Sequence, residues 1–147
     1  MIPRLLLKGV YLPITKSPRD TIQLAENIVK SITSPICIAL FGELGAGKTV
    51  FVKGLAKGLG IDDVIKSPTF VLMRSYLGRM ALHHIDLYRI KKEEEFLPFE
   101  ETLMNDGITA IEWADRAEDF LPDNRVDVYF KILSSEEREI TIDDYRN

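Results

Sequence analysis

The sequence predicts an α/β protein in which antiparallel hairpins extend a mixed, mainly parallel central sheet. Three observations point to this fold class. A continuous apolar run over residues 36–41 is typical of a strand buried on both faces. Apolar residues recur with helical spacing before and after that run, and alternating patterns follow later in the chain. The length of 147 residues is typical of one domain, so we expect residues 1–147 to form a single unit.

The first third of the chain is predicted to contain a strand, a helix and a second strand. Residues 4–14 are expected to form a short strand and its exit. Ser17 as N-cap, Pro18 in the first turn and Asp20 three residues after the cap predict the start of a helix. That helix is expected to end near Ser34-Pro35. The apolar stripe on its buried face comprises Ile22, Ala25, Ile28, Val29 and Ile32.

The rest of the chain is predicted to form two hairpins with other elements between them. Alternating segments over residues 69–76 and 80–88 predict the first hairpin. Segments over residues 126–133 and 139–142 predict the second hairpin. Residues 91–104 are acidic and helical in character.

Turn and breaker residues divide the region between the hairpins. Pro98 is expected to split the acidic region into two short helices. Asn105-Asp106-Gly107 predicts a turn ahead of a strand over residues 108–113. An irregular stretch is expected to follow, closed by Leu121-Pro122.

Composition and charge exclude several classes of protein. Apolar residues make up 46% and charged residues 29%, near the globular average, which excludes a disordered tail, a collagen-like fibre and a coiled-coil rod. Cys37, the single cysteine, has no intramolecular disulfide partner and is expected to be a buried, inert thiol. With 19 basic and 23 acidic residues, the net charge is −4. Contact with RNA should therefore be local or made through a partner.

The sequence also gives an expectation about location. Apolar runs such as residues 36–41 are far shorter than a membrane span needs. The N-terminal residues lack the pattern of a signal peptide. We therefore expect a cytoplasmic protein without membrane contact.

A glycine-rich loop follows the apolar run. Residues 42–49, GELGAGKT, match the pattern G-x-x-x-x-G-K-[ST], and a helix through about Leu59 is expected to follow. Glycines let the backbone wrap around phosphate oxygens, and the helix N-terminus adds partial positive charge. The sequence therefore predicts a P-loop NTPase-like three-layer fold with a nucleotide site. The residues expected to bind the nucleotide here are Gly42, Glu43, Leu44, Gly45, Ala46, Gly47, Lys48, Thr49 and Val50.

The sequence favours ATP and Mg²⁺ as the ligands of this loop. Lys48 is expected to contact the β- and γ-phosphates, and the Thr49 hydroxyl to bind Mg²⁺. Guanine-specific P-loop proteins read the base with an N-K-x-D element, which this chain lacks. No D-x-x-G motif begins at Asp86 either, because the next residues are Leu87, Tyr88 and Arg89.

Two carboxylates at predicted strand ends are candidates for magnesium chemistry. Asp86 is expected to bind Mg²⁺ beside Thr49, because Mg²⁺ prefers oxygen ligands; a helix N-cap or a surface acid is the alternative. Glu112 ends the next apolar strand, where it would position the attacking water or complete the magnesium shell. His84 faces the same way as Asp86 and is expected to be an orienting hydrogen-bond partner rather than a catalytic base.

Two further features each have two interpretations. Ser67-Pro68-Thr69-Phe70 lies between the helix after the glycine-rich loop and the first hairpin. Its hydroxyls would either report on γ-phosphate and metal, as switch loops do, or cap an ordinary loop turn. Trp113, the only tryptophan, would either lie close to the site or fill the core.

Four motifs occur together in this chain. They are GELGAGKT at residues 42–49, SPTF at 67–70, HIDLYR at 84–89 and IEW at 111–113. In these motifs and their spacing, the chain resembles the bacterial TsaE (YjeE) family, which supplies the ATPase for threonylcarbamoyladenosine biosynthesis on tRNA. The resemblance spans about residues 15–125. Many families share the P-loop, whereas SPTF together with HxDxYR and EW is far more specific.

The resemblance implies a small P-loop ATPase that acts with the TsaB–TsaD pair. Together they would sustain modification of adenosine 37 in tRNAs that read codons beginning with A, with tRNA contacted through the complex. Ala114 is one departure, because many relatives have proline there; it puts the local turn geometry in question. The implied site residues are Lys48 for phosphate, Thr49 for Mg²⁺, Thr69 in a switch loop, Asp86 as magnesium-side acid, Glu112 as second essential acid and Trp113 near the nucleotide or partner face.

The expected activity is slow ATP hydrolysis that partner proteins raise. Phosphoryl transfer depends on positioning and charge neutralisation, and no arginine finger is evident. Arg89 and Arg116 are candidates for one, with surface ion pairs as the alternative. The acidic residues 93–95 and 100–101 would form either a docking face or a solvated helix face. Rival functions are a small-molecule P-loop kinase, which usually needs an arginine-bearing lid, and a nucleotide-sensing interaction module.

Overall fold

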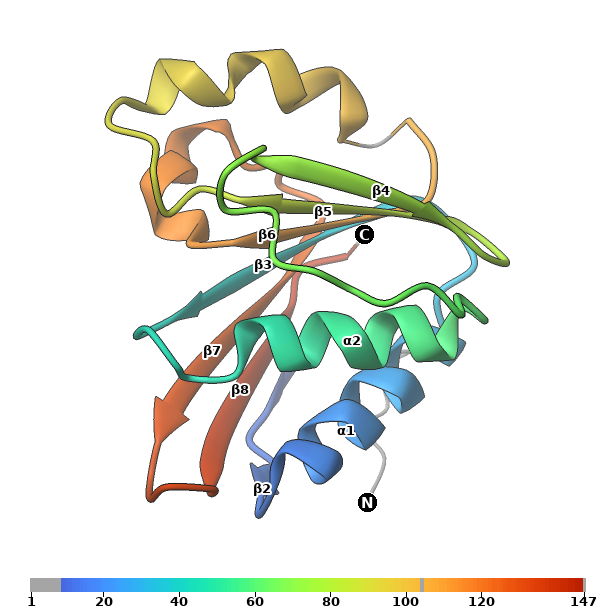
Figure 1. Cartoon of the computed structure of the whole chain (residues 1–147), viewed down its shortest axis with the longest axis vertical. Helices are drawn as coiled ribbons and strands as arrows, with labels where there is room; N and C mark the ends of the chain where they lie inside the picture. The colour runs from blue at the N-terminus through green and yellow to red at the C-terminus, as the bar shows by residue number, and fades with distance from the viewer. Residues whose placement is uncertain (1–8, 104, 147) are drawn as a thin grey trace.

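The computed structural model describes residues 9–103 and 105–146 and has three layers (Figure 1). Helices α1 (Pro18–Lys30) and α2 (Lys48–Gly58) pack on one face of a central sheet. Two 3-10 helices, η1 (Glu93–Thr102) and η2 (Ala114–Phe120), cover part of the other face. Within the described residues, no helix is both long and apolar enough to cross a membrane.

The sheet is mixed, with parallel strands at its centre. Its order is β1-β8-β7-β3-β6-β5-β4, and β2 also pairs with β8. Neighbours among β5, β6, β3 and β7 are parallel, whereas β4, β8, β1 and β2 pair antiparallel. The predicted fold class is therefore confirmed. The strands are β1 (Gly9–Tyr11), β2 (Ile14–Thr15), β3 (Ile36–Gly42), β4 (Met73–Leu77), β5 (Ala81–Asp86), β6 (Ile108–Glu112), β7 (Arg125–Ile132) and β8 (Arg138–Asp144).

Parallel pairing brings the ends of three strands to one edge of the sheet. In the register of β3 with β6, Leu40 lies opposite Glu112. In the register of β5 with β6, Asp86 lies opposite Glu112. The glycine-rich loop leaves the carboxyl end of β3 at this same edge and leads directly into α2. Residues from distant parts of the sequence therefore meet around the loop.

Helix α1 starts where its capping residues predict. The Ser17 hydroxyl accepts a hydrogen bond from the Asp20 backbone N–H at 3.1 Å, and the Asp20 carboxylate accepts one from the Lys16 backbone N–H at 3.0 Å. α1 ends at Lys30, earlier than the end predicted near Ser34-Pro35. Three residues of the predicted stripe are buried within it, Ile22 is half-buried, and Ile32 is buried just after the helix. Leu24, which the prediction omitted, is also buried because it lies one turn before Ile28 on the same face.

Each face of the sheet covers its own apolar cluster. On the α1 and α2 side, the rings of Phe51 and Phe130 meet edge to face with centroids 5.6 Å apart. On the η1 and η2 side, Cys37 packs in a cluster with Phe96 and Ile111. The expected burial of Cys37 is confirmed, and that burial raises the pKa of its thiol to about 12. The thiol is therefore protonated at neutral pH.

Several predicted strands are shorter than expected; β5, for example, spans Ala81–Asp86 instead of residues 80–88. β4 begins at Met73 instead of Thr69, because the Pro68 carbonyl accepts hydrogen bonds from the backbone N–H groups of Val71 and Leu72 and forms a turn. β6 ends at Glu112, because Trp113 adopts the left-handed conformation with φ 57°. Of the strand predicted over residues 4–14, residues 4–8 lie outside the described residues, and β1 and β2 account for much of the rest.

The helical regions after β5 also differ from the prediction. η1 is one 3-10 helix that contains Pro98, not two helices split there. Pro98 is exposed and its missing N–H removes only one i→i+3 bond, which does not end the helix. The stretch expected to be irregular contains η2, whose residues Ala114 and Ala117 are buried against the sheet. Burial of these two small side chains fixes a segment that has no clear helical pattern.

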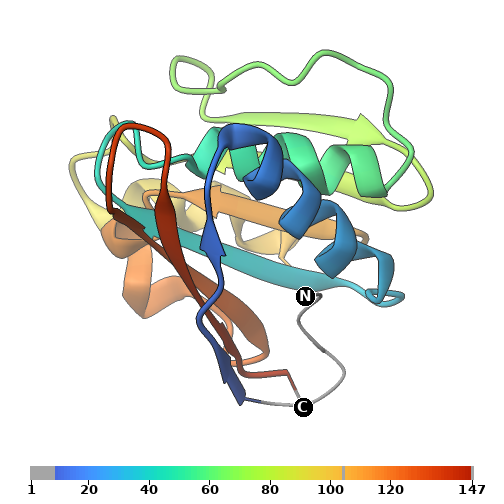
Figure 2. The same ribbon diagram turned by 90° about the horizontal axis from the view of Figure 1, so that it is seen from below.

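α1 and α2 lie side by side (Figure 2), and Gly54 is a point of close contact between them. A Cβ atom at Gly54 would lie 2.4 Å from the Ile22 carbonyl oxygen and 2.6 Å from the Ala25 Cβ. Replacing Gly54 with alanine should therefore lower the free energy of unfolding by about 1–3 kcal/mol, despite the higher helix propensity of alanine. Urea denaturation measures the change. Lys53→Ala, on the exposed side of the same helix, should change it by less than about 0.5 kcal/mol. A Gly54→Ala protein as stable as the parent would contradict the close contact.

Candidate functional site

A cavity of about 350 Å³ opens at the edge of the sheet where the parallel strands end. Its walls come from the glycine-rich loop, the first turn of α2, the loop before β4 and the segments that follow β5 and β6. Most residues predicted to form the site line this one cavity. They are Leu44, Gly45, Ala46, Gly47, Lys48, Thr49, Val50, Thr69, Asp86, Glu112 and Trp113.

The lining of the cavity differs from the predicted site at four residues. Gly42 and Glu43 do not line the cavity; their backbone carbonyls instead accept hydrogen bonds from the Lys48 ammonium group. Ser67, whose hydroxyl the sequence offered either to the site or to a loop turn, and Tyr88, which had no assigned role, also line the cavity. Ser67 belongs to the SPTF motif and Tyr88 to the HIDLYR motif, so those motifs carried a signal for them.

The glycine-rich loop forms a cradle of backbone groups. Gly45 and Gly47 have φ of 78° and 106°, a left-handed conformation that glycine adopts without steric cost. Gly47 is the N-cap of α2, and no side chain caps the N–H groups of the first turn. Free N–H groups and the helix dipole at this end favour an anion. The loop can therefore bind phosphate oxygens.

Lys48 lies inside the site without a carboxylate partner. Its side chain is 4% exposed, and its ammonium nitrogen lies 3.0 Å from the Glu43 carbonyl oxygen and 3.7 Å from the centroid of the Trp113 ring. Burial lowers the pKa of Lys48, and the charges of Glu112, Asp115 and Asp86 act in the opposite direction. Among the described residues, no carboxylate comes within 4.0 Å of this ammonium group. Its charge is thus available to an anionic ligand.

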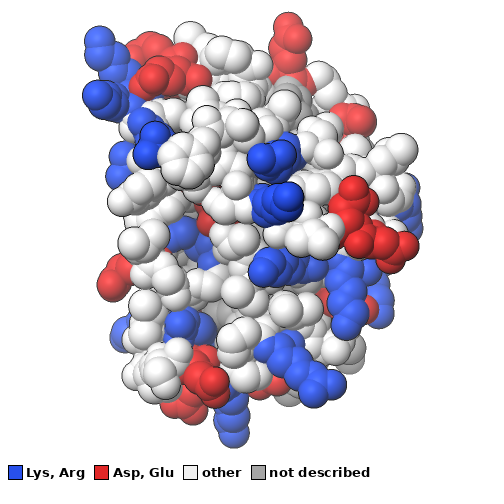
Figure 3. Space-filling view, in the orientation of Figure 1, with Lys and Arg blue, Asp and Glu red and all other residues white. Residues whose placement is uncertain are grey.

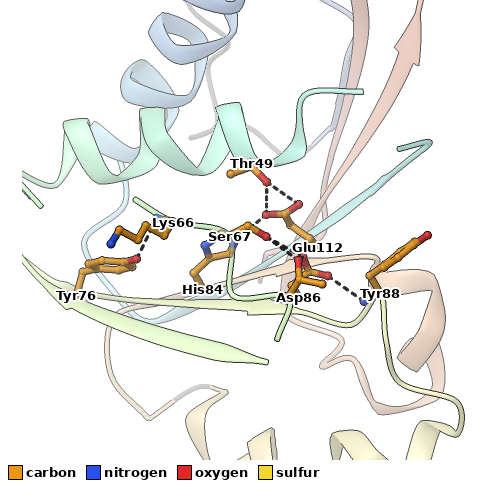
Figure 4. A network of polar contacts seen from close by, with 9 residues as sticks. Thr49, Lys66, Ser67, Tyr76, His84, Asp86, Tyr88 and Glu112 are labelled. Carbon is orange, nitrogen blue, oxygen red and sulfur yellow. Dashed lines mark hydrogen bonds and ion pairs between the residues drawn. The ribbon is translucent and has the colours of Figure 1, made fainter. Parts of the chain in front are cut away.

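Glu112 connects the first turn of α2 to β5 (Figure 4). The Thr49 hydroxyl lies 2.8 and 3.0 Å from the two carboxylate oxygens of Glu112. The His84 Nε2 atom lies 2.5 Å from one of them, and the His84 ring is fully buried. The expectation that His84 makes a hydrogen bond in the site is confirmed, with Glu112 as its partner. These contacts hold the carboxylate of Glu112, a residue that is 3% exposed, in one position.

Asp86 ties the loop before β4 to the site. Its Oδ2 atom accepts hydrogen bonds from the hydroxyls of Thr69 at 2.8 Å and Ser67 at 3.4 Å, and its Oδ1 atom accepts one from the Tyr88 backbone N–H at 2.9 Å. With 3% exposure, Asp86 is not a surface acid. No helix begins after it either; the bond to Tyr88, two residues on, is an Asx turn. The position of loop residues 67–69 therefore depends on Asp86.

Aromatic side chains form one wall of the cavity. Trp113 is half-buried: it lines the cavity, where its ring lies 5.1 Å from that of Tyr88, and it also packs against the apolar cluster on the η1 and η2 side. The guanidinium of Arg116 lies 5.5 and 5.6 Å from these two rings, and that of Arg89 lies 4.3 Å from the Phe70 ring. Neither arginine forms an ion pair within the described chain, and neither lines the cavity.

The side chains at the cavity suit a hard divalent cation. The Thr49 hydroxyl and the carboxylates of Asp86 and Glu112 offer only oxygen atoms, which Mg²⁺ prefers. Within the described residues, no three His, Cys, Asp or Glu side chains are grouped closely enough to hold a metal ion on their own. A cation here would complete its coordination with water or with oxygens of a ligand, as Mg²⁺ does in phosphate sites.

Comparisons with known proteins give a consistent family. Residues 15–140 match the family described as threonylcarbamoyl adenosine biosynthesis protein TsaE. The chain is 38% identical to tRNA threonylcarbamoyladenosine biosynthesis protein TsaE of Treponema pallidum, over 88% of this chain and 97% of the relative. It is 38% identical to the protein of the same name in Bacillus subtilis (86% and 81% covered) and in Aquifex aeolicus (96% and 98% covered).

A solved structure supports the same assignment. The crystal structure of Bacillus subtilis YdiB superimposes with a TM-score of 0.80 and 31% sequence identity, and covers 95% of this chain and 88% of that one. The sequence match covers residues 15–140 and therefore includes every residue that lines the cavity. This chain therefore belongs to the TsaE family of threonylcarbamoyladenosine biosynthesis proteins.

Proposed function

We propose that this chain binds and hydrolyses ATP with Mg²⁺ to support threonylcarbamoylation of adenosine 37 in tRNA. The observation that carries the proposal is the meeting of the glycine-rich loop, Lys48 and two buried carboxylates at one cavity. A phosphate cradle next to paired acids is the arrangement that phosphoryl transfer requires. Membership of the TsaE family supports the biosynthetic role.

In the proposed mechanism, Lys48 and the loop hold the phosphates. The N–H groups of the loop and of the first turn of α2 would donate to phosphate oxygens. The Lys48 ammonium would exchange the carbonyls of Gly42 and Glu43 for the β- and γ-phosphates. Because its pKa is lowered by burial, a phosphate partner also restores the stability of its charged form.

Thr49, Asp86 and Glu112 would hold Mg²⁺ directly or through water. The ion supplies neutralisation of the charge on the transferred phosphoryl group. Glu112 is already oriented by Thr49 and His84, so it can accept a hydrogen bond from a water molecule without rearranging. Asp86 bonds the hydroxyl of Thr69, so a change at the metal position would move the loop that carries Thr69.

We further propose that the protein is cytoplasmic and hydrolyses ATP slowly until TsaB and TsaD bind. Among the described residues, no arginine lines the cavity, so none is in place to stabilise the transition state. On the face shown in Figure 3, basic side chains form one short row, with acidic side chains to either side of it. The net charge of −4 favours tRNA contact through the complex.

Incubation with γ-labelled ATP and Mg²⁺ tests the proposal. We expect phosphate to be released to water slowly by the protein alone and faster when the TsaB–TsaD pair is added. Transfer of label to a small acceptor would instead indicate a small-molecule kinase. Binding of ATP with no release of phosphate under either condition would indicate a nucleotide-sensing module. An activity that ignores the TsaB–TsaD pair would contradict the partner assignment alone.

Lys48→Ala should weaken ATP binding about 10- to 150-fold, because a charge-assisted contact with phosphate contributes roughly 1.5–3 kcal/mol. Isothermal titration calorimetry measures the dissociation constant. Lys53→Ala removes a neighbouring exposed lysine from the same helix and should leave the affinity unchanged. Equal affinities of Lys48→Ala and the parent would exclude Lys48 from the phosphate site.

Asp86→Asn should leave ATP binding measurable but reduce turnover by a factor of about 100 or more, because the ion loses a charged ligand where transition-state charge develops. Steady-state phosphate release and calorimetric ATP binding separate the two effects. Asp106→Asn, at an exposed carboxylate away from the cavity, is the matched control. Full turnover by Asp86→Asn would assign the metal role to another residue.

Trp113 should report ATP binding by fluorescence. It is the only tryptophan, and the Lys48 ammonium lies 3.7 Å from its ring centroid. Movement of that charge to a phosphate changes the field at the indole, so the emission should shift in wavelength or intensity as MgATP is added. Lys48→Ala should abolish the shift over the same concentrations. Emission that stays constant while calorimetry records binding would show that Lys48 does not leave the ring.

A further inference from the structure

Arg138 joins the last hairpin to the glycine-rich loop. It is the first residue of β8, and its Nε donates to the Ala46 carbonyl at 3.0 Å. Its Nη2 donates to the Gly45 carbonyl at 3.2 Å. These bonds cross 92 and 93 residues of sequence and join the start of β8 to the loop that precedes α2.

The same guanidinium also holds its own hairpin turn. Its Nη1 donates to the Ser134 carbonyl at 2.8 Å and to the Glu137 carbonyl at 2.9 Å. Within the described residues, no carboxylate lies within 4.0 Å of Arg138. A planar, permanently charged group with all its partners among carbonyls is a rigid bridge between hairpin and loop.

The contact with Ala46 sets the direction of a neighbouring N–H group. The Ala46 carbonyl and the Gly47 N–H belong to one planar trans peptide and point in opposite directions. Because Arg138 holds the carbonyl on the hairpin side, the Gly47 N–H is directed away from the hairpin. Gly47 lines the cavity with φ of 106°. Glycine can adopt many other backbone conformations, so the contact with Arg138 restricts Gly47 to this one.

We infer that Arg138 is a positioning residue that holds the glycine-rich loop in its phosphate-binding conformation. The inference rests on the proposed function, because it concerns binding of a polyphosphate by that loop. Arg138 need not touch the ligand: it fixes the donors beforehand, which reduces the ordering cost of binding. Its charge also polarises the peptides that it contacts and strengthens their N–H groups as donors.

The inference predicts a loss of affinity that does not depend on the nucleoside. Arg138→Gln should weaken binding of both MgATP and magnesium tripolyphosphate by a similar factor of about 10. Arg138→Lys keeps the charge but cannot bond two carbonyls as a fork, so its affinities should lie between those of the parent and Arg138→Gln. The KM for ATP should rise while kcat at saturating ATP changes less than about threefold, because the chemical groups stay in place.

The experiment combines calorimetry with amide hydrogen exchange. Titrations of both ligands into parent, Arg138→Gln and Arg138→Lys give the affinities, with thermal melting to verify folding. Exchange of the ligand-free proteins reports on the loop directly and should be faster over residues 45–47 in Arg138→Gln. Two control variants should have the affinities and the exchange rates of the parent. Glu136→Gln lies on the same hairpin turn, and Arg146→Gln lies just after β8, where Arg146 forms an ion pair with Asp144.

Three results would overturn the inference. One is unchanged affinity of Arg138→Gln for both ligands. The second is loss of ATP affinity with tripolyphosphate affinity retained, which would make Arg138 a contact of the nucleoside. The third is unchanged exchange over residues 45–47 in Arg138→Gln. Failure of the folded parent to bind either ligand would contradict the proposed function, and the exchange experiment would then still test whether Arg138 orders the loop.

Discussion

The parallel pairing of β3, β6 and β5 is the constraint on which the rest of the structure depends. Strands that run in the same direction end at the same edge, so Glu112 of β6 lies beside Asp86 of β5. The loop that leaves β3 turns over these two residues and places Thr49 within 2.8 Å of Glu112. Antiparallel neighbours would send these ends to opposite edges and separate the acids from the loop. The chemistry of the cavity thus follows from the direction of three strands.

The buried carboxylates and the buried ammonium group of the cavity are stabilised by different kinds of contact. The carboxylates of Asp86 and Glu112 accept hydrogen bonds from hydroxyls, a backbone N–H and a histidine ring, and these bonds compensate for their burial. Lys48 instead rests on backbone carbonyls and an aromatic ring. Keeping opposite charges apart in this way leaves both able to interact with a ligand that carries both phosphate and a metal ion.

Local patterns in the sequence predict much of this fold and most of the site. Ser17 with Pro18 predicts the start of α1, and the apolar run predicts β3, because capping and continuous burial act over few residues. The glycine-rich pattern predicts the turn between β3 and α2 for the same reason, because its glycines adopt the left-handed conformation there. No such local segment predicts the order of the strands. That order depends on pairing between strands that are distant in the sequence.

The parts that sequence patterns do not predict involve partners far along the chain or uncommon backbone conformations. The sequence pattern predicts Trp113 as the last residue of a strand, but its φ of 57° ends the strand, and its side chain lines the cavity. Pro98 resembles a helix breaker, yet a 3-10 helix accommodates it. Arg138 has no pattern that marks it, because its partners Gly45 and Ala46 lie more than ninety residues earlier. Such contacts become visible only when the hairpin and the loop are placed in space.

The resting place of Lys48 has a consequence for the departure of a ligand. When an anion leaves a buried lysine that has no other contacts, the unpaired charge opposes dissociation strongly. Here the carbonyls of Gly42 and Glu43 and the face of Trp113 would accept the ammonium group as the proposed anion leaves. These contacts would offset part of the binding energy and lower the barrier to release. For a protein proposed to pass repeatedly between nucleotide-loaded and empty states, this arrangement favours rapid exchange over tight retention.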